Sequence, residues 1–374
     1  MIEELDEIIS VPLNPTIRAW KEKGDKIIGC LCCYVPEEII YAAGILPYRI
    51  RATGCRKSLQ GDLWMSTLNC SFARSCLEFA LDGTYGFLDG LVASDSCGHA
   101  HRLYDNWRFS AELPFMHFLT VPHKTGDSAV AWYREEIANF KNRLEHFSGI
   151  AITEESIEKA TEVYNETRRL LRELYELRRS DHPPITGLES QKLVLAAMSM
   201  PKDQYNKLLS KYLEEIGERE PLTKYRARLM VLGSALDDPA FIKIIEDLGG
   251  LVVTDALCFG SRYLWEPVRI GRDILVSLAK SYLNRAICPR MMDQHESLFT
   301  LIKEMVQSFK VDGIIFEKMQ YCDIWGGESL FLEKKLKASN IPFLSLQRDH
   351  VMTSSAQTAT RVEAFIEMVS EVIG

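Results

Sequence analysis

The chain has 374 residues, 47% of them hydrophobic and 26% charged, which is typical of globular proteins and too long for one small core. Its 44 Lys and Arg against 52 Asp and Glu give a net charge of −8, which argues against a protein that binds nucleic acid by neutralising phosphates. No apolar run approaches the roughly 20 residues that span a bilayer, and the acidic residues 1–7 are unlike a signal peptide, so we expect a cytoplasmic protein.

The first 150 residues alternate short helical segments with short apolar runs. We expect helices over residues 37–44, 71–81 and 129–146. We expect strands over residues 46–50, 88–94 and 115–121. Helices that alternate with short apolar strands are typical of a parallel sheet, so residues 1–150 are predicted to form an N-terminal α/β domain.

Residues 151–222 have a different pattern. Apolar residues recur at helical spacing from Ile157 to Tyr175, with Arg and Glu between them, and acidic residues open this segment. The chain stays polar and helical to about residue 222. We therefore expect a helical connector over residues 151–222.

The alternation returns over residues 223–374, which we expect to form a C-terminal α/β domain. The expected strands are residues 229–233, 251–255, 313–316 and 341–346. The expected helices are residues 239–248, 296–309, 329–339 and 358–373. The predicted fold class is α/β, with two Rossmann-like doubly wound parallel-sheet units joined by a helical segment.

The ten cysteines are placed unevenly. Seven lie in the first hundred residues and three follow: Cys30, Cys32, Cys33, Cys55, Cys70, Cys76 and Cys97, then Cys258, Cys288 and Cys322. In a reducing cytosol these are free thiols, buried small side chains or metal ligands.

Three of these cysteines lie where an open α/β sheet binds its ligands, beyond the carboxyl ends of the strands. Cys97 follows the strand 88–94, Cys322 follows the strand 313–316, and Cys70 precedes the helix 71–81, whose first amides favour a thiolate. Three thiolates suit zinc or an iron–sulfur cluster, and their spacing does not separate the two. Ordinary buried cysteines are the alternative for each of them.

The residues around these cysteines resemble the 2-hydroxyacyl-CoA dehydratase and benzoyl-CoA reductase family. Residues 29–47, with Gly-Cys-Leu-Cys-Cys-Tyr-Val-Pro at their start, resemble the opening signature of that family. The resemblance continues, in order, through the segments 69–75, 88–92, 95–97, 313–323 and 357–365. It therefore covers essentially the whole chain and is of the D-component type.

The resemblance implies two Rossmann-like halves that hold an iron–sulfur cluster between them, usually in a heterodimer of two related subunits. The positions that match the three ligands of a [4Fe–4S] cluster are Cys70, Cys97 and Cys322. A separate ATP-hydrolysing iron–sulfur activator protein supplies one electron at very low potential. In the dehydratases this electron turns a 2-hydroxyacyl-CoA into a ketyl radical anion, and loss of water gives the 2-enoyl-CoA. The implied function is the iron–sulfur subunit of such a lyase.

The chain also departs from the dehydratase pattern, which keeps two other functions open. A related branch carries a double-cubane [8Fe–9S] cluster that needs more cysteine ligands, and Cys32, Cys33 and Cys55 could supply some or could simply be packing residues. The segment that ends at Trp107 is more similar to benzoyl-CoA reductase members than to dehydratases. The alternative is thus a benzoyl-CoA-type or double-cubane low-potential reductase, the latter as a homodimer. A third possibility is a non-catalytic electron-relay or thiolate-zinc protein.

Other residues are candidates for polar roles, and none is assigned to catalysis. We expect His99 and His101 to form either a metal-binding pair on one strand face or a polar cleft rim. Arg262 suits a phosphate of coenzyme A or an internal ion pair, and Gly326-Gly327 suits a phosphate-binding helix start before residue 329. A low-potential cluster also favours a site with few nearby cations.

Overall fold

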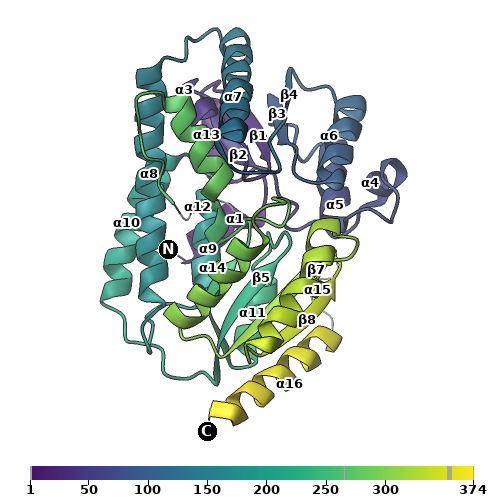
Figure 1. Ribbon diagram of the computed structural model, residues 1–374. Helices are drawn as coiled ribbons and strands as arrows, with labels where there is room; N and C mark the ends of the chain where they lie inside the picture. The colour runs from purple at the N-terminus through teal and green to yellow at the C-terminus, as the bar shows by residue number, and fades with distance from the viewer. Residues whose placement is uncertain (1, 265, 286, 352–355, 374) are drawn as a thin grey trace.

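The computed structural model (Figure 1) describes residues 2–264, 266–285, 287–351 and 356–373. Its strands form two four-stranded sheets in which every pairing is parallel. The first sheet contains Ile27–Leu31 (β1), Leu46–Arg49 (β2), Gly90–Ser94 (β3) and Phe115–Leu119 (β4), in the order β2-β1-β3-β4. The second contains Ala227–Gly233 (β5), Gly250–Ala256 (β6), Gly313–Met319 (β7) and Phe343–Arg348 (β8), in the order β6-β5-β7-β8.

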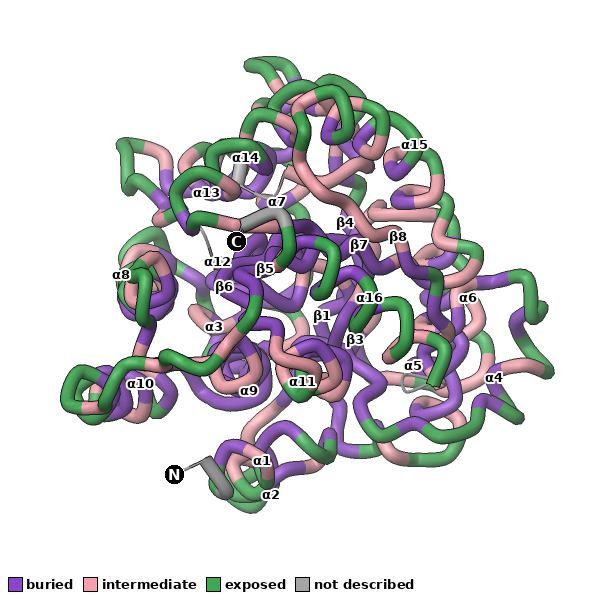
Figure 2. The backbone as a smooth tube through the Cα atoms, turned by 90° about the horizontal axis from the view of Figure 1, so that it is seen from below, coloured by how far each residue is buried: buried purple, intermediate pink, exposed green. Residues whose placement is uncertain are grey.

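The two sheets repeat one topology, and this confirms the predicted fold class. In each sheet the first strand of the unit lies between the second and the third, with the fourth at the far edge. The strands β1, β3, β5 and β6 are buried along their whole length, because helices cover both faces of a parallel sheet. In Figure 2 these strands form the buried interior, and most exposed residues lie in the surrounding helices and loops.

The helices alternate with the strands in both units, and the sequence analysis did not expect several of them, including Gly98–Ser110 and Ile274–Arg285. Those of the first unit are Ile2–Ser10 (α1), Pro15–Glu22 (α2), Glu37–Ala42 (α3), Leu59–Trp64 (α4), Ser71–Leu81 (α5), Gly98–Ser110 (α6) and Asp127–Ser148 (α7). The middle of the chain forms Glu154–Leu177 (α8), Gly187–Ala197 (α9) and Lys202–Gly217 (α10). The second unit has Ala240–Asp247 (α11), Ser261–Leu264 (α12), Ile274–Arg285 (α13), His295–Ser308 (α14), Asp323–Ala338 (α15) and Ala356–Ile373 (α16).

One sequence expectation about local structure is wrong, and one alternative that the sequence left open is excluded. The helix expected from residue 329 begins at Asp323, and the Gly326 amide already donates to the Cys322 carbonyl at 2.7 Å. Gly326 and Gly327 therefore lie inside α15 and do not form a phosphate-binding helix start. His99 and His101 lie on α6, where residues two apart point in different directions, so they do not share one face of a strand.

Helices of the second unit pack on the first, so the units share one hydrophobic core. The helix α13 packs on α7 and α8, and Figure 1 shows it beside both. One core cluster joins Ile39 of α3, Leu171 of α8, Leu278 of α13 and Met230 of β5. The division at residues 150 and 222 stays a prediction, because this shared core says how the parts pack and not where an independent domain would end.

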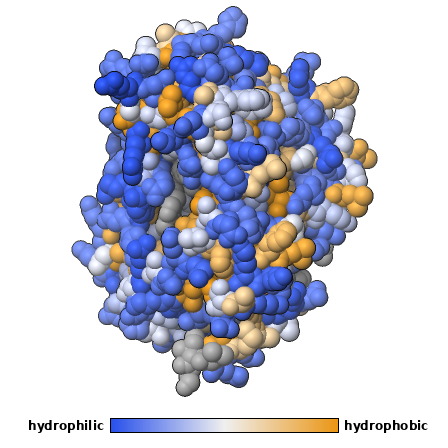
Figure 3. Space-filling model, viewed as in Figure 1, coloured by the Kyte–Doolittle hydropathy of each residue, from blue (hydrophilic) through white to orange (hydrophobic). Residues whose placement is uncertain are grey.

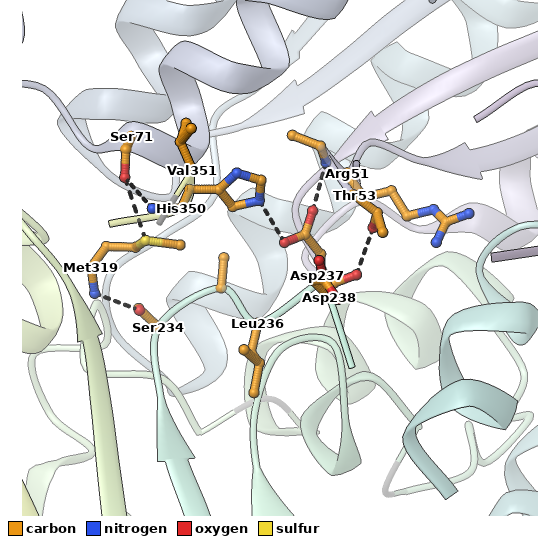
Figure 4. Close-up of polar contacts among 12 residues, drawn as sticks. Arg51, Thr53, Ser71, Ser234, Leu236, Asp237, Asp238, Met319, His350 and Val351 are labelled. Carbon is orange, nitrogen blue, oxygen red and sulfur yellow. Dashed lines mark hydrogen bonds and ion pairs between the residues drawn. The ribbon is translucent and has the colours of Figure 1, made fainter. Parts of the chain in front are cut away.

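Polar contacts also join the two units through segments that follow the carboxyl ends of β2, β5 and β8 (Figure 4). The Asp237 carboxylate accepts from the Ala52 amide at 2.6 Å, and the Thr53 hydroxyl donates to the Asp237 carbonyl at 2.6 Å. The His350 ring contacts the same carboxylate at 2.8 Å, while its backbone amide donates to the Ser71 hydroxyl at 2.9 Å. These buried contacts fix the position of one sheet relative to the other.

The surface in Figure 3 is mainly hydrophilic, as the net charge of −8 leads us to expect. Large apolar side chains are exposed on α4 and α6, where the rings of Trp64 and Phe109 lie 5.7 Å apart beside Leu63. In the part of the chain that the structure describes, no helix is both long enough and apolar enough to span a membrane.

Candidate functional site

A cavity of about 150 Å³ lies where the carboxyl ends of the two sheets meet. Its walls include Leu31 and Met319, the last residues of β1 and β7, and Ser96 and Ser234, which follow β3 and β5. The strand order reverses between β1 and β3 in one sheet and between β5 and β7 in the other. Ligands of open α/β sheets bind at this kind of switch point, and here two switch points face one cavity.

Seven of the ten cysteines line this cavity. They are Cys32, Cys33, Cys70, Cys97, Cys258, Cys288 and Cys322. The structure thus brings together Cys70, Cys97 and Cys322, the three expected from the sequence, with two of the three additional candidates, Cys32 and Cys33. The third candidate, Cys55, lies elsewhere, and its thiol donates to the Lys57 carbonyl at 3.2 Å. We refer below to Cys70, Cys97 and Cys322 as the cap cysteines, and to Cys32, Cys33, Cys258 and Cys288 as the loop cysteines.

Each cap cysteine occupies the residue just before a helix: Cys70 before α5, Cys97 before α6 and Cys322 before α15. Three helix N-termini with their partial positive charge therefore converge on this side of the cavity. Burial raises the pKa of Cys97 to about 12, although the amides of His99 and Ala100 act in the opposite direction. Burial likewise raises the pKa of Cys70 and Cys322. Ionising these thiols requires a compensating positive charge, which a bound metal provides.

The loop cysteines come from irregular segments that follow β1, β6 and α13. Cys33 donates a hydrogen bond to Cys32, which holds the pKa of Cys32 well below its usual range and raises that of Cys33. The sequence analysis did not identify Cys258 and Cys288 as candidates, because neither stands in a recognisable motif. Cys258 was nevertheless detectable, since it comes three residues after the end of the predicted strand 251–255.

The donor set suits a multinuclear cluster better than a single metal ion. Thiolates on one zinc ion lie about 2.3 Å from it and so must cluster tightly. Among the described residues, no three His, Cys, Asp or Glu side chains lie close enough to share one ion. Thiolates that hold a cluster stand farther apart, because several metal atoms lie between them. The seven cysteines in the lining come from both halves of the chain, and such a set of thiols fits iron–sulfur ligation.

Two arginines also face the cavity, which the sequence analysis did not anticipate for a site expected to have few cations. The exposed fractions of Arg49 and Arg262 are 5% and 4%, and within the described residues neither forms an ion pair. Arg49 lies over the Phe259 ring and Arg262 over the Trp325 ring, each 5.1 Å from the ring centre. The internal ion pair expected for Arg262 is therefore not formed. Arg262 instead lines the cavity, and its contact with a coenzyme A phosphate stays a prediction.

Histidines and acidic residues form a polar rim near the cap cysteines. His99 contacts the Tyr321 carbonyl at 2.7 Å and the Asp323 carboxylate at 3.3 Å, so it joins α6 to the start of α15. His101 contacts Asp95 at 2.7 Å. Because the two imidazoles engage different partners, they do not form a metal-binding pair, and the polar-rim prediction describes them correctly.

Comparison with known proteins gives a consistent family assignment. Residues 32–369 match the family model described as 2-hydroxyglutaryl-CoA dehydratase, D-component. The chain is 28% identical to the (R)-2-hydroxyglutaryl-CoA dehydratase subunit beta of Acidaminococcus fermentans, over 98% of each chain. It is 26% identical to the (R)-phenyllactyl-CoA dehydratase beta subunit of Clostridium sporogenes, over 97% of each chain. It is 27% identical to a benzoyl-CoA reductase subunit of Thauera aromatica, over 88% of each chain.

Proposed function

Because this chain belongs to the D-component family of 2-hydroxyglutaryl-CoA dehydratases, we propose that it is the iron–sulfur subunit of a 2-hydroxyacyl-CoA dehydratase. The observation that supports this proposal is the convergence of seven cysteines from both halves of the chain at two facing switch points. When bound there, a cluster supplies one low-potential electron to the thioester carbonyl of an acyl-CoA. We propose Cys70, Cys97 and Cys322 as the ligands of a [4Fe–4S] cluster.

The residues of the chain have two tasks in this proposal, to hold the cluster and to keep water away from it. The cap cysteines supply thiolates, and the first amides of α5, α6 and α15 donate to their sulfur atoms. Phe72, Leu103 and Trp325 give the cavity an apolar wall. Exclusion of water protects a strongly reducing electron from side reactions.

Two protein partners belong to the proposal. The relatives are themselves named as subunits of dehydratases and of a reductase, which favours a related second subunit that forms a heterodimer with this chain. An ATP-hydrolysing iron–sulfur activator would deliver the electron. We propose a cytoplasmic location, where thiols stay reduced and available for a cluster.

The test is anaerobic purification, followed by iron and acid-labile sulfide analysis per chain and by native mass. We expect about four iron atoms per chain and a mass that includes a second, related subunit. Zinc alone, or no metal after strict exclusion of oxygen, would overturn the proposal.

A second candidate, a double-cubane low-potential reductase, is favoured by the number of cysteines in the cavity. Three cap cysteines and four loop cysteines are more thiols than one [4Fe–4S] cluster can use. This candidate predicts about eight iron atoms per chain in a homodimer. The variant Cys258→Ser separates the two, since it lowers the iron content if the loop cysteines are ligands and leaves about four iron atoms per chain if they are not.

A further inference from the structure

Arg49 and Arg262 place two positive charges inside the cysteine-lined cavity, one from each half of the chain. Arg49 is the last residue of β2, and Arg262 belongs to α12. Both side chains are more than nine-tenths buried. In both, Nε and Nη1 have no hydrogen-bond partner among the described residues, and Nη2 of Arg262 reaches only the Gly233 carbonyl, at 3.4 Å.

Two unpaired guanidinium groups in one apolar cavity are costly to bury. A charge removed from water without a partner destabilises the fold by several kcal/mol, and each unmet donor adds to that cost. Other buried arginines of this chain do have acceptors, as Arg228 shows by donating to the carbonyls of Arg178 and Phe309. The two cavity arginines thus imply an anion that occupies the cavity.

The loop cysteines line the same cavity as the two arginines and can hold such an anion as ligands of a bound metal centre. Burial acts to lower the pKa of Arg49, but the neighbouring Cys32, Cys33 and Cys258 act to raise it when ionised, as does Glu37, and the pKa is raised overall. The pKa of Arg262 is raised in the same way, against burial, by Cys288, Cys258 and Cys33. Cys33 and Cys258 thus act on both guanidinium groups. Cys32 acts on Arg49 and Cys288 on Arg262, and all of them line one cavity.

The cap cysteines have a different electrostatic setting. The guanidinium groups that act on Cys70 are those of Arg348 and Arg74. Both are already neutralised, since Arg348 pairs with Glu317 and Arg74 with Asp62, each at 2.5 Å. Uncompensated positive charge is thus concentrated on the loop-cysteine side of the cavity.

We propose that Arg49 and Arg262 are positioning residues that donate hydrogen bonds to sulfur atoms of the iron–sulfur cofactor on its loop-cysteine side and raise its reduction potential. This inference rests on the proposed function. Reduction adds one electron and breaks no bond, so the cofactor gains one negative charge that the two guanidinium groups stabilise. Net charge and hydrogen bonds to sulfur are the terms that set cluster potentials.

The test compares anaerobically purified full-length wild type, Arg49→Gln, Arg262→Gln, Arg49→Lys and Arg262→Lys in a reductive titration followed by electron paramagnetic resonance. At the potential where wild type is half reduced, we expect the ratio of reduced to oxidised cofactor to fall at least tenfold in each Gln variant. For one electron this corresponds to a reduction potential that is lower by 59 mV. The Lys variants keep the charge and should stay within threefold of wild type.

The matched control is Arg51→Gln, which removes the same charge two residues away from Arg49. Arg51 is fully buried, but its guanidinium reaches the Ile8 carbonyl at 3.2 Å and does not line the cavity. We expect this variant to titrate like wild type.

The outcomes separate this inference from the proposed function. Unchanged potentials in iron-replete Gln variants overturn the inference alone, and so does an equal shift in the Arg51→Gln control. Absence of iron from wild type overturns the inference together with the proposed function. If a Gln variant does not fold, as judged by circular dichroism, its Lys counterpart decides, because a tenfold fall there contradicts a role of charge.

Discussion

Burial and helix ends have opposite effects on the pKa of the cap cysteines: burial raises it, and the first amides of a helix lower it. The first amides of α5, α6 and α15 favour a thiolate at each cap cysteine, yet burial dominates and raises the pKa of Cys97 to about 12. A metal reverses this balance, because a coordinating thiol loses its proton. The cap cysteines are thus inert thiols without a cofactor and strong ligands with one, which suits a site that must not react with oxidants on its own.

Replacing one cap cysteine tests this directly. In Cys97→Ser we expect iron binding to be abolished while the chain stays folded, because a hydroxyl at this position does not ionise to replace a thiolate ligand. The measurement is iron and sulfide per chain after anaerobic purification, with circular dichroism to confirm the fold. Full retention of iron would contradict the assignment of the cap cysteines.

The controls are cysteines of the same unit that lie outside the cavity. Cys55 lies near Ser75 and Lys57, and Cys76 is fully buried within α5. We expect Cys55→Ser and Cys76→Ser to keep the iron content of wild type.

At the scale of elements, strand β5 ends next to the cavity at a residue whose backbone conformation only glycine adopts easily. Gly233 has φ of 147°, and an added Cβ would lie 1.7 Å from the Glu317 carbonyl oxygen of β7. This close approach lets Ser234 turn into the cavity, where its hydroxyl accepts from the Met319 amide at 2.8 Å. The position of the cavity wall therefore depends on residue 233 being a glycine, which has no side chain.

The variant Gly233→Ala should lower the free energy of unfolding by about 2–4 kcal/mol, because β5 and β7 must separate to admit the methyl group. Urea denaturation measures this. Gly217→Ala is the control, since an added Cβ there meets nothing within 4 Å at the end of α10, and it should be neutral or slightly stabilising. Equal stability of the two variants would contradict this account of Gly233.

A contact between β4 and α7 makes the stability of the fold depend on pH. His117 of β4 is buried against the Phe140 ring of α7, and Arg143 of α7 donates to its Nδ1 at 3.0 Å. Burial, together with the charge of Arg143, lowers the pKa of His117 from 6.5 to about 4. The ring is therefore neutral in the folded chain over a range where the unfolded chain binds a proton.

This predicts a loss of stability on acidification. As pH falls from 6.5 to about 4, the free energy of unfolding should drop by about 3 kcal/mol from this group and then level off. Urea denaturation in steps of pH measures the slope. His117→Gln, which keeps an acceptor for Arg143, should flatten it, and the same change at exposed His182 should not. An unchanged slope in His117→Gln would contradict the role of His117.

At the scale of the whole molecule, the cavity links the two halves of the chain. The cap cysteines include two residues of the first unit and one of the second, and the loop cysteines are divided equally. A cofactor held by both sets would therefore join the sheets covalently, in addition to the contacts of Asp237 and His350 that already join them. Binding to the folded state alone stabilises that state.

Removal of the metal should then lower the thermal unfolding midpoint by several degrees. Anaerobic calorimetry before and after treatment with an iron chelator measures the change. Cys97→Ser serves as the control, because a chain that binds no iron should not respond to the chelator. An identical midpoint in the iron-loaded and stripped wild-type chains would show that the cofactor does not join the halves.

Most of the α/β alternation could be predicted, and the exceptions have physical reasons. The strand β1 was missed because Gly29, a residue that weakens the strand pattern, stands at its centre. The early start of α15 was missed because Gly326 and Gly327 are poor helix formers that the structure nevertheless keeps inside a helix, with Trp325 and Leu332 packed in the core.

From the order of amino acids alone came the family resemblance, the paired α/β architecture and the three cap cysteines, because helix starts and strand ends are local features. The tertiary structure decided which other groups join them. It placed Cys258 and Cys288 in the cavity, left Cys55 outside and turned Arg49 and Arg262 inward. These residues are far apart in the chain, and they meet only because two sheets of the same topology face each other at their carboxyl ends.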